Sequence, residues 1–301
     1  MYVKAKKSLG QHFLKDESIA QRIVDSLEPI TAKEQSDVLE VGPGMGVLTK
    51  YLIGRDDLRL KLVEIDTESI EYLRLNYPRI APSLLEADFL KMDLSKFFAG
   101  NFRIIGNFPY NISSQIFFKV LDYKEQIPEV VGMVQKEVAQ RIAAPSGSKT
   151  YGILSVLLQA WYDIEYLFTV DEHVFIPPPK VKSAVIRLRR NNRTDLGCDP
   201  ELFKKVIKTT FNQRRKTIRN SLKPIISIPA NAERLFTSAN TDDLLTSANA
   251  DNSLTSAKNT NPELQNISKY LEKRPEQLSV EEFIELTNLI DLYSKQSVLY
   301  N

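Results

Sequence analysis

Asp37-Val38-Leu39-Glu40-Val41-Gly42-Pro43-Gly44-Met45-Gly46 is the stretch that decides the fold. Its apolar residues predict a buried strand, and its glycines predict a sharp turn into a helix from about Val47 to Leu52. A nicotinamide fingerprint would place the third glycine at Val47. The spacing here is Gly-x-Gly-x-Gly behind an acid, which is typical of turns that bind S-adenosylmethionine (SAM).

The same alternation of strand and helix continues on the carboxyl side of this turn. Apolar runs predict further strands, and an amphipathic helix is expected between the first two of them, through Ile70, Leu73 and Leu75. Alternating strands and helices indicate a parallel sheet with helices on both faces, a Rossmann-like α/β fold. The expected strands cover residues 60–66, 83–87, 104–107, 130–134, 162–168 and 183–188.

Polar residues stand where successive strands end. Glu64 is placed to accept hydrogen bonds from ribose hydroxyls, and Asp88 to accept one from the adenine amino group of the cofactor. Gly42 and Gly44 would let the amino-acid part of SAM lie against bare backbone. Three successive strand ends of this chemistry predict a SAM site.

A second stretch, Ile104-Ile105-Gly106-Asn107-Phe108-Pro109-Tyr110-Asn111-Ile112-Ser113, carries the expected chemistry. A buried strand breaks at Gly106 and Pro109 into a stiff loop. The Asn107 side-chain oxygen and the Phe108 carbonyl are a pair of acceptors for an exocyclic NH2 group. Tyr110 beside them offers a surface on which a planar base stacks.

Composition excludes several classes of protein. The chain has 301 residues, 43% of them hydrophobic, and no apolar run approaches a membrane span. The first residues lack a secretory signal, so we expect a cytoplasmic protein. One cysteine and two histidines exclude an internal disulfide and make a metal centre improbable, so no metal is expected.

Basic residues are concentrated although the net charge is only +2. One group lies at residues 204–223, where Glu201 is almost the only nearby acid, and Lys4, Lys6 and Lys7 form a second group. Such patches on a nearly neutral chain indicate a polyanion partner.

Beyond about Arg190 the pattern becomes purely helical. Helices are expected at 200–211, 214–222 and 281–292, which predicts a catalytic domain at 1–190 and a small helical domain at 191–301. The units beginning Thr237-Ser238-Ala239, Thr246-Ser247-Ala248 and Thr255-Ser256-Ala257 are too few and too polar to build a solenoid. We interpret the repeat, at about 235–260, as a dispensable insertion in a surface loop.

Taken together, these motifs resemble the small-subunit ribosomal RNA adenine dimethyltransferases of the KsgA/RsmA type. The resemblance covers nearly the whole chain except the repeat. It is carried by Leu9-Gly10-Gln11-His12-Phe13-Leu14, Glu40–Gly46, Glu64–Asp66, Ala87-Asp88, Gly106–Ser113, Lys149–Val156, Phe175–Ser183 and Phe211–Leu222.

The resemblance implies SAM contacts from His12, Leu14, Gly42, Glu64, Asp88 and Asn107. His12 stands where Asn is commoner, and Phe108 where Leu or Ile is commoner. The implied substrate is a pair of adjacent adenosines in the hairpin loop near the 3′ end of small-subunit rRNA, each methylated twice at N6. The implied role is in ribosome biogenesis, with the immature 30S subunit as partner. We expect the enzyme to be a monomer.

The residues also suggest how the substrate is held. Tyr110 would stack on one face of the extruded adenine and Phe175 on the other. Phosphate contacts are expected from Lys180 and Lys182 beside the cleft, and from the helical tail, where Arg214, Arg215 and Arg219 share a face with Lys216 next to them.

Three alternatives remain open. The erythromycin-resistance type of large-subunit rRNA methyltransferase has the same core and chemistry. An RNA-binding assembly factor with incidental activity would keep its role without Asn107. A DNA adenine methyltransferase is disfavoured because nothing in the sequence resembles a domain that reads duplex DNA.

Overall fold

The computed structural model describes residues 3–29, 35–226 and 267–299, the last four of these by their backbone alone. The predicted repeat insertion at Thr237–Lys258 lies outside the described residues. The chain divides into two compact units. The first comprises Met1–Ala144 and Leu157–Arg193, and the second comprises Pro145–Val156 and Thr194–Asn301.

This division differs from the expected boundary at residue 190, because a segment from the middle of the chain, Pro145–Val156, belongs to the second unit. Within that unit the ring edge of Tyr151 packs against Phe211, with ring centroids 6.1 Å apart. The N–H of Gly147 donates to the carbonyl of Glu276 at 2.6 Å. A boundary drawn where the pattern becomes helical cannot detect such an excursion.

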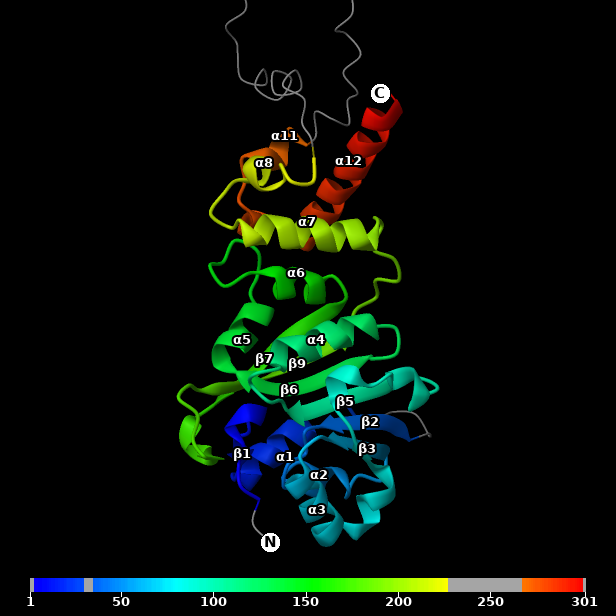
Figure 1. Ribbon diagram of the computed structural model, residues 1–301, viewed down its shortest axis with the longest axis vertical. Helices are drawn as coiled ribbons and strands as arrows, with labels where there is room; N and C mark the ends of the chain where they lie inside the picture. The colour runs from blue at the N-terminus through cyan, green and yellow to red at the C-terminus, as the bar shows by residue number, and fades with distance from the viewer. Residues whose placement is uncertain (1–2, 30–34, 227–266, 300–301) are drawn as a thin grey trace, which may run out of the picture. The chain divides into compact units, whose positions relative to one another are not determined.

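A seven-stranded sheet forms the centre of the first unit (Figure 1). Its strands run in the order β4 (Leu84–Glu86), β3 (Leu58–Glu64), β2 (Ser36–Val41), β5 (Phe102–Asn107), β6 (Glu129–Gln135), β9 (Ser183–Arg190) and β7 (Tyr162–Val170). The first five are parallel to one another, and β9 pairs antiparallel with both β6 and β7. The expected parallel sheet is therefore confirmed for its first five strands.

Helices cover both faces of this sheet, with α1, α2 and α3 on one side and α4 and α5 on the other (Figure 1). Residues Phe102–Ile105 are buried on both faces of β5, as a central parallel strand requires. The helices of this unit are α1 (Glu17–Asp25), α2 (Thr49–Leu52), α3 (Thr67–Asn76), α4 (Ser113–Asp122) and α5 (Lys136–Ile142). Short 3-10 turns lie at η1 (Lys7–Leu9), η2 (Pro78–Ser83), η3 (Phe89–Lys91), η4 (Leu94–Lys96) and η5 (Glu172–Val174).

A small second sheet ties the N-terminal segment to the chain before β9. Strand β1 (Phe13–Leu14) pairs antiparallel with β8 (Phe175–Ile176), so that Leu14 lies opposite Phe175. Strands of two residues carry no periodicity, and the sequence pattern therefore did not reveal them.

The remaining helices are α6 (Ile153–Gln159), α7 (Pro200–Asn212), α8 (Ile218–Ser221), α11 (Ser268–Leu271) and α12 (Val280–Leu299), with a 3-10 turn η6 (Pro275–Gln277). The expected helix over 214–222 is wrong, because Arg214–Lys216 form a turn and α8 begins only at Ile218. A continuous helix would bond the N–H of Ile218 to the carbonyl of Arg214. That N–H instead donates to the carbonyl of Lys273 at 2.8 Å. Within the described ranges, no helix has both the length and the apolar character needed to cross a bilayer.

Candidate active site

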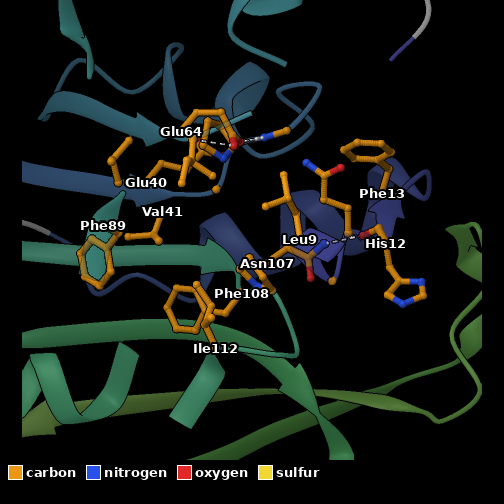
Figure 2. Close-up of a pocket in the computed structure, with 18 of the residues that line it drawn as sticks. Leu9, His12, Phe13, Glu40, Val41, Glu64, Phe89, Asn107, Phe108 and Ile112 are labelled. Carbon is orange, nitrogen blue, oxygen red and sulfur yellow. Dashed lines mark hydrogen bonds between the residues drawn. The ribbon is translucent and has the colours of Figure 1, made fainter. Parts of the chain in front are cut away.

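A cavity of about 240 Å³ opens at the carboxyl ends of β2, β3 and β5 (Figure 2). This is the edge of an open α/β sheet at which ligands bind. The N-terminal segment Leu9–Leu14 forms a further wall. The cavity is lined by nearly all the residues predicted for catalysis and cofactor binding, namely His12, Leu14, Gly42, Gly44, Glu64, Asp88, Asn107, Phe108, Pro109 and Tyr110.

The glycine turn brings bare backbone to the cavity. Gly42 and Gly44 have φ values of +69° and +57°, a region that side chains with a Cβ rarely adopt. A Cβ on Gly44 would lie 2.9 Å from the ring of Phe13. The turn therefore requires glycine both for its conformation and for the packing of the N-terminal segment.

Glu64 ends β3 with its carboxylate held by main-chain donors. The N–H of Gly44 donates to Oε2 at 3.0 Å, and those of Ile65 and Asp66 donate to Oε1 at 2.9 Å each. Burial raises the pKa of Glu64, and these three bonds partly offset that rise. Since a carboxylate has about four lone-pair positions, one position on Oε2 is left for a ligand hydroxyl.

Glu40 is a second buried acid at the cavity, to which the sequence analysis gave no role. Its side chain is 1% exposed and accepts a hydrogen bond from the hydroxyl of Thr49 at 2.6 Å. Burial raises the pKa of Glu40 to about 8, and the nearby Glu64 adds to the rise. Glu40 is therefore neutral at pH 7.

The loop after β4 forms another wall of the cavity. Asp88 caps η3 by accepting a hydrogen bond from the N–H of Leu90 at 3.0 Å. The ammonium group of Lys119 on α4 donates to the carbonyl of Leu90 at 3.1 Å and also to that of Met92. These bonds satisfy carbonyls at the end of the short helix and hold the loop in place.

Ile65 is a cavity residue that the sequence analysis did not assign. Its side chain is 52% exposed, which is unusual for a large apolar residue in this fold. An apolar residue directly after a strand-end acid was the available signal. Together with Leu90 it offers an apolar surface on which a purine ring can lie.

Asn107 projects from the end of β5, and its amide is oriented by the N-terminal segment. Its Nδ2 donates to the main-chain carbonyl of His12 at 3.0 Å, as Figure 2 shows. This bond fixes which end of the amide is nitrogen, so Oδ1 is left as an acceptor. Among the residues that the structure describes, none donates to this oxygen.

Phe108 follows Asn107 and is held by its ring. The side chain is 0% exposed and lies against two glycines on neighbouring strands. A Cβ on Gly106 would come within 2.8 Å of the ring, and one on Gly132 within 2.4 Å. The N–H of Phe108 also donates to the carbonyl of Met133 at 3.0 Å. The main chain that carries the Phe108 carbonyl is therefore fixed on two sides.

Tyr110 is anchored at both its ring and its hydroxyl group. The ring stacks on the imidazole of His12, with centroids 5.2 Å apart and planes inclined by 28°. The hydroxyl is hydrogen-bonded to that of Ser183, which is fully buried. His12 Nδ1 lies 2.7 Å from the carbonyl of Pro177. The His12 side chain is thus directed toward Tyr110, while its main-chain carbonyl faces Asn107.

Phe175 does not fulfil its expected role in this arrangement. It is 1% exposed, packs in the same buried cluster as Val174 and Val185, and does not line the cavity. Its pairing with Leu14 through β1 and β8 draws it into the core. The ring therefore has no face free to stack on a base, and the expectation is corrected.

The residues expected to contact RNA are less free than their charges suggested. Lys182 pairs with Asp171 at 2.5 Å, and Arg219 pairs with Glu272 at 2.7 Å. Arg214 lies 3.7 Å from Glu276, and Lys216 donates to Gln213 at 2.9 Å. The two remaining members of the set, Lys180 and Arg215, are exposed. The expected common helix face of Arg214, Arg215 and Arg219 is wrong, because α8 begins after the first two.

Comparison with solved structures identifies the fold. A dimethyladenosine transferase from Plasmodium falciparum superposes with a TM-score of 0.69 at 22% identity, covering 94% of this chain and 98% of that one. The 23S rRNA methyltransferase ErmE superposes with a TM-score of 0.59 at 24% identity, covering 93% and 99%. The expected Rossmann-like class I methyltransferase fold with a helical C-terminal part is thereby confirmed.

Comparison of sequences identifies the family. The family model of the ribosomal RNA adenine dimethylases matches residues 2–261. The ribosomal RNA small subunit methyltransferase A of Parabacteroides distasonis is 56% identical over 289 residues, 95% of this chain and 93% of that protein. The protein of the same name from Cytophaga hutchinsonii is 55% identical over 291 residues, 96% of this chain and 98% of that one. The chain therefore belongs to the ribosomal RNA adenine dimethylase family, as its sequence motifs predicted, and is an enzyme of that family.

Proposed function

We propose that this enzyme transfers methyl groups from SAM to N6 of two adjacent adenosines in the 3′-terminal hairpin loop of small-subunit rRNA. The product is N6,N6-dimethyladenosine, formed during biogenesis of the small subunit. The observation that carries the proposal is the acceptor pair at Asn107 and Phe108, set at the mouth of a cavity with the chemistry of a SAM site. The relatives at 55–56% identity are named for the small subunit, which favours this RNA over large-subunit RNA.

The chemistry of the cavity fits SAM. The free lone-pair position on Glu64 suits a ribose hydroxyl, and Asp88 suits the adenine amino group. Ile65 and Leu90 offer apolar contact to the purine, and the glycine turn leaves space for the amino-acid part. When bound, SAM supplies a methyl group on a positively charged sulfur.

Asn107 and Phe108 act on the incoming adenine. Its N6 is a poor nucleophile because the lone pair is delocalised into the ring. Hydrogen bonds from the N6 hydrogens, two in the first round and one in the second, to Asn107 Oδ1 and the Phe108 carbonyl favour a pyramidal nitrogen whose lone pair is free to attack. In each round one N6 hydrogen then leaves as a proton to water. The same two oxygens stabilise the positive charge that develops on this nitrogen. Because both are fixed before the substrate arrives, they need little reorganisation during the reaction.

Tyr110 positions the extruded base. Its ring is anchored by Ser183 and backed by His12, so one aromatic face is rigid. Stacking on such a face contributes about 1–3 kcal/mol per base. The base must leave its loop stack to reach this position, as in other enzymes that modify bases.

Phosphate contacts are assigned to Lys180, Lys182, Arg214, Arg215, Lys216 and Arg219. Such contacts position RNA without reading its sequence. Lys182 and Arg219 must exchange an internal carboxylate partner for a phosphate. The exposed Lys180 and Arg215 bind without that exchange, so their loss is expected to reduce RNA affinity most.

The test is transfer of labelled methyl from SAM to immature small subunits that lack the modification, followed by nucleoside analysis. Labelled dimethyladenosine confined to the 3′-terminal hairpin is the expected result. Naked large-subunit RNA serves as the second substrate, and preferential labelling of that RNA would contradict the proposal. A protein with Asn107→Ala that binds subunits and supports their maturation normally would instead indicate an assembly factor.

A further inference from the structure

The N-terminal segment Lys6–Leu14 connects two places that are far apart in the sequence. Lys6 at one end, and Gln11 farther along, are hydrogen-bonded to Asp66, at the start of α3. At the other end the carbonyl of His12 receives the amide of Asn107. Between these ends the segment forms a wall of the cofactor cavity.

Asp66 is the fastening point. Its side chain is 1% exposed and accepts hydrogen bonds from the ammonium group of Lys6, from Gln11 Nε2 at 3.3 Å and from the hydroxyl of Ser69 at 2.8 Å. Burial alone would raise the pKa of Asp66, but these bonds outweigh it and lower the pKa. The carboxylate is therefore ionised, and its side-chain partners satisfy it.

The segment is also braced internally, so a shift at Lys6 is transmitted along it. Gln11 Oε1 accepts the main-chain N–H of Lys6 at 2.8 Å, which closes a loop around Gly10. Gly10 has φ +64°, and a Cβ there would lie 2.5 Å from the Asn111 side chain. Gln11 immediately precedes His12, so the position of Gln11 sets that of the carbonyl that binds Asn107.

We propose that Asp66, through Lys6 and Gln11, is a positioning residue for methyl transfer, holding the His12 carbonyl where it orients the catalytic amide of Asn107. The ion pair acts at a distance from the reacting atoms. It also retains the cofactor, because the same segment is a wall of the cavity. Lys6 is thus engaged within the protein, and the expectation that it belongs to a basic group facing a polyanion is corrected.

Lys6→Met tests this inference, with Lys7→Met as the matched control. Both variants remove one positive charge from the same segment, so they have the same net charge. Of these two lysines, only Lys6 has ion pairs with described residues, namely with Asp66 and with Glu68 at 3.1 Å. Because Lys6→Met leaves the buried Asp66 carboxylate with only Gln11 and Ser69 as side-chain partners in the described part of the chain, the unfolding midpoint of the variant is measured first and compared with that of Lys7→Met. The first readout of function is the dissociation constant for SAM by calorimetry, which needs no turnover.

We expect Lys6→Met to weaken SAM binding and to lower kcat, each by roughly tenfold, the size of one charge-assisted hydrogen bond. Lys7→Met is expected to leave the SAM dissociation constant within about twofold. Lys6→Arg, which keeps the charge and the donors, is expected to restore most of both losses. A Lys6→Met protein that behaves like Lys7→Met would overturn the inference.

A double-mutant cycle with Asn107→Ala distinguishes positioning from a general structural role. If Lys6 acts through Asn107, Lys6→Met lowers kcat in the intact protein and not in the Asn107→Ala background, while the loss of SAM affinity persists in both. Equal losses of kcat in both backgrounds would contradict the coupling. The inference rests on the proposed function, which different results would contradict. Those results are full turnover by the Asn107→Ala protein, or no SAM binding by the unaltered protein.

Discussion

Glu40 offers a test in which the size of the effect follows from one buried group. Its carboxyl has a pKa near 4.5 in the unfolded chain and about 8 in the folded protein. Between these values the folded state keeps a proton that the unfolded state releases. Stability therefore falls as the pH rises through this window, and it is independent of this group above pH 8. The full span is about 5 kcal/mol, from about 1.4 kcal/mol per pKa unit.

Glu40→Gln removes the titration while keeping an oxygen that accepts the Thr49 hydroxyl. Relative to the unaltered protein, the variant is expected to gain about 1.4 kcal/mol in free energy of unfolding for each pH unit between 5 and 8. Any effect of the amide on packing is the same at every pH. The test is therefore how the difference in free energy of unfolding changes with pH, and not the size of that difference at one pH. Glu165→Gln is the control, since hydrogen bonding from Arg187 lowers the pKa of that carboxyl. Its effect is expected to be flat over the same pH range.

The assay is urea unfolding of the cofactor-free protein at pH 5, 6, 7 and 8. The chain has one tryptophan, Trp161, and it lies in the first unit with Glu40. Its fluorescence therefore follows the unit in question. A difference between Glu40→Gln and the unaltered protein that is the same at all four pH values would show that Glu40 is ionised in the folded state, and would refute the reasoning.

Four further predictions concern the site and the tail. Asn107→Ala is expected to lower single-turnover methyl transfer by about 10²–10³-fold while RNA binding by gel shift is retained, and unchanged turnover would remove its catalytic role. Glu64→Ala is expected to raise the SAM dissociation constant by roughly 10–100-fold in calorimetry and to leave RNA affinity unchanged, because it removes the acceptor for a ribose hydroxyl. Tyr110→Phe and Ser183→Ala break the same hydrogen bond. The KM for RNA of the double variant is therefore expected to be no higher than that of the more affected single variant. Additive increases in KM would show that the two hydroxyls act separately. Deletion of Thr237–Lys258 is expected to leave methyl transfer and the unfolding midpoint intact, and a protein that no longer folds would show that the repeat is structural.

The sheet was predictable because its strands are strongly patterned. β2 is rich in β-branched and apolar residues, as is β5, and each strand reaches a glycine near its carboxyl end, at Gly42 and Gly106. Glu64 ends β3 and Asp88 follows β4. The carboxyl ends of parallel strands lie at the same edge of the sheet, so the positions of these two residues in the sequence predicted that they line one cavity. The glycine turn likewise has only one way to meet its φ requirements.

What could not be predicted depends on partners distant in the sequence. The ion pair between Lys6 and Asp66 spans 60 residues, and nothing local distinguishes Lys6 from Lys7. Phe175 next to prolines fits a core ring as well as an exposed one, and its pairing with Leu14 decides the matter. The helix expected from Arg214 begins only at Ile218, because the carbonyl of Lys273 takes the N–H of Ile218, a competitor that periodicity does not reveal.

The slot that holds the Phe108 ring has a consequence for how this enzyme can be altered. Gly132 would place a Cβ 2.4 Å from that ring, so alanine at 132 is incompatible with phenylalanine at 108, while a leucine at 108 frees part of the space. Residues 108 and 132 share one packing space, so a substitution at either position alone disturbs the packing that holds the main chain at 108. A library that varies both positions together should recover active pairs whose single substitutions are inactive. Those pairs would show how far the carbonyl at 108 can be displaced before the adenine no longer binds.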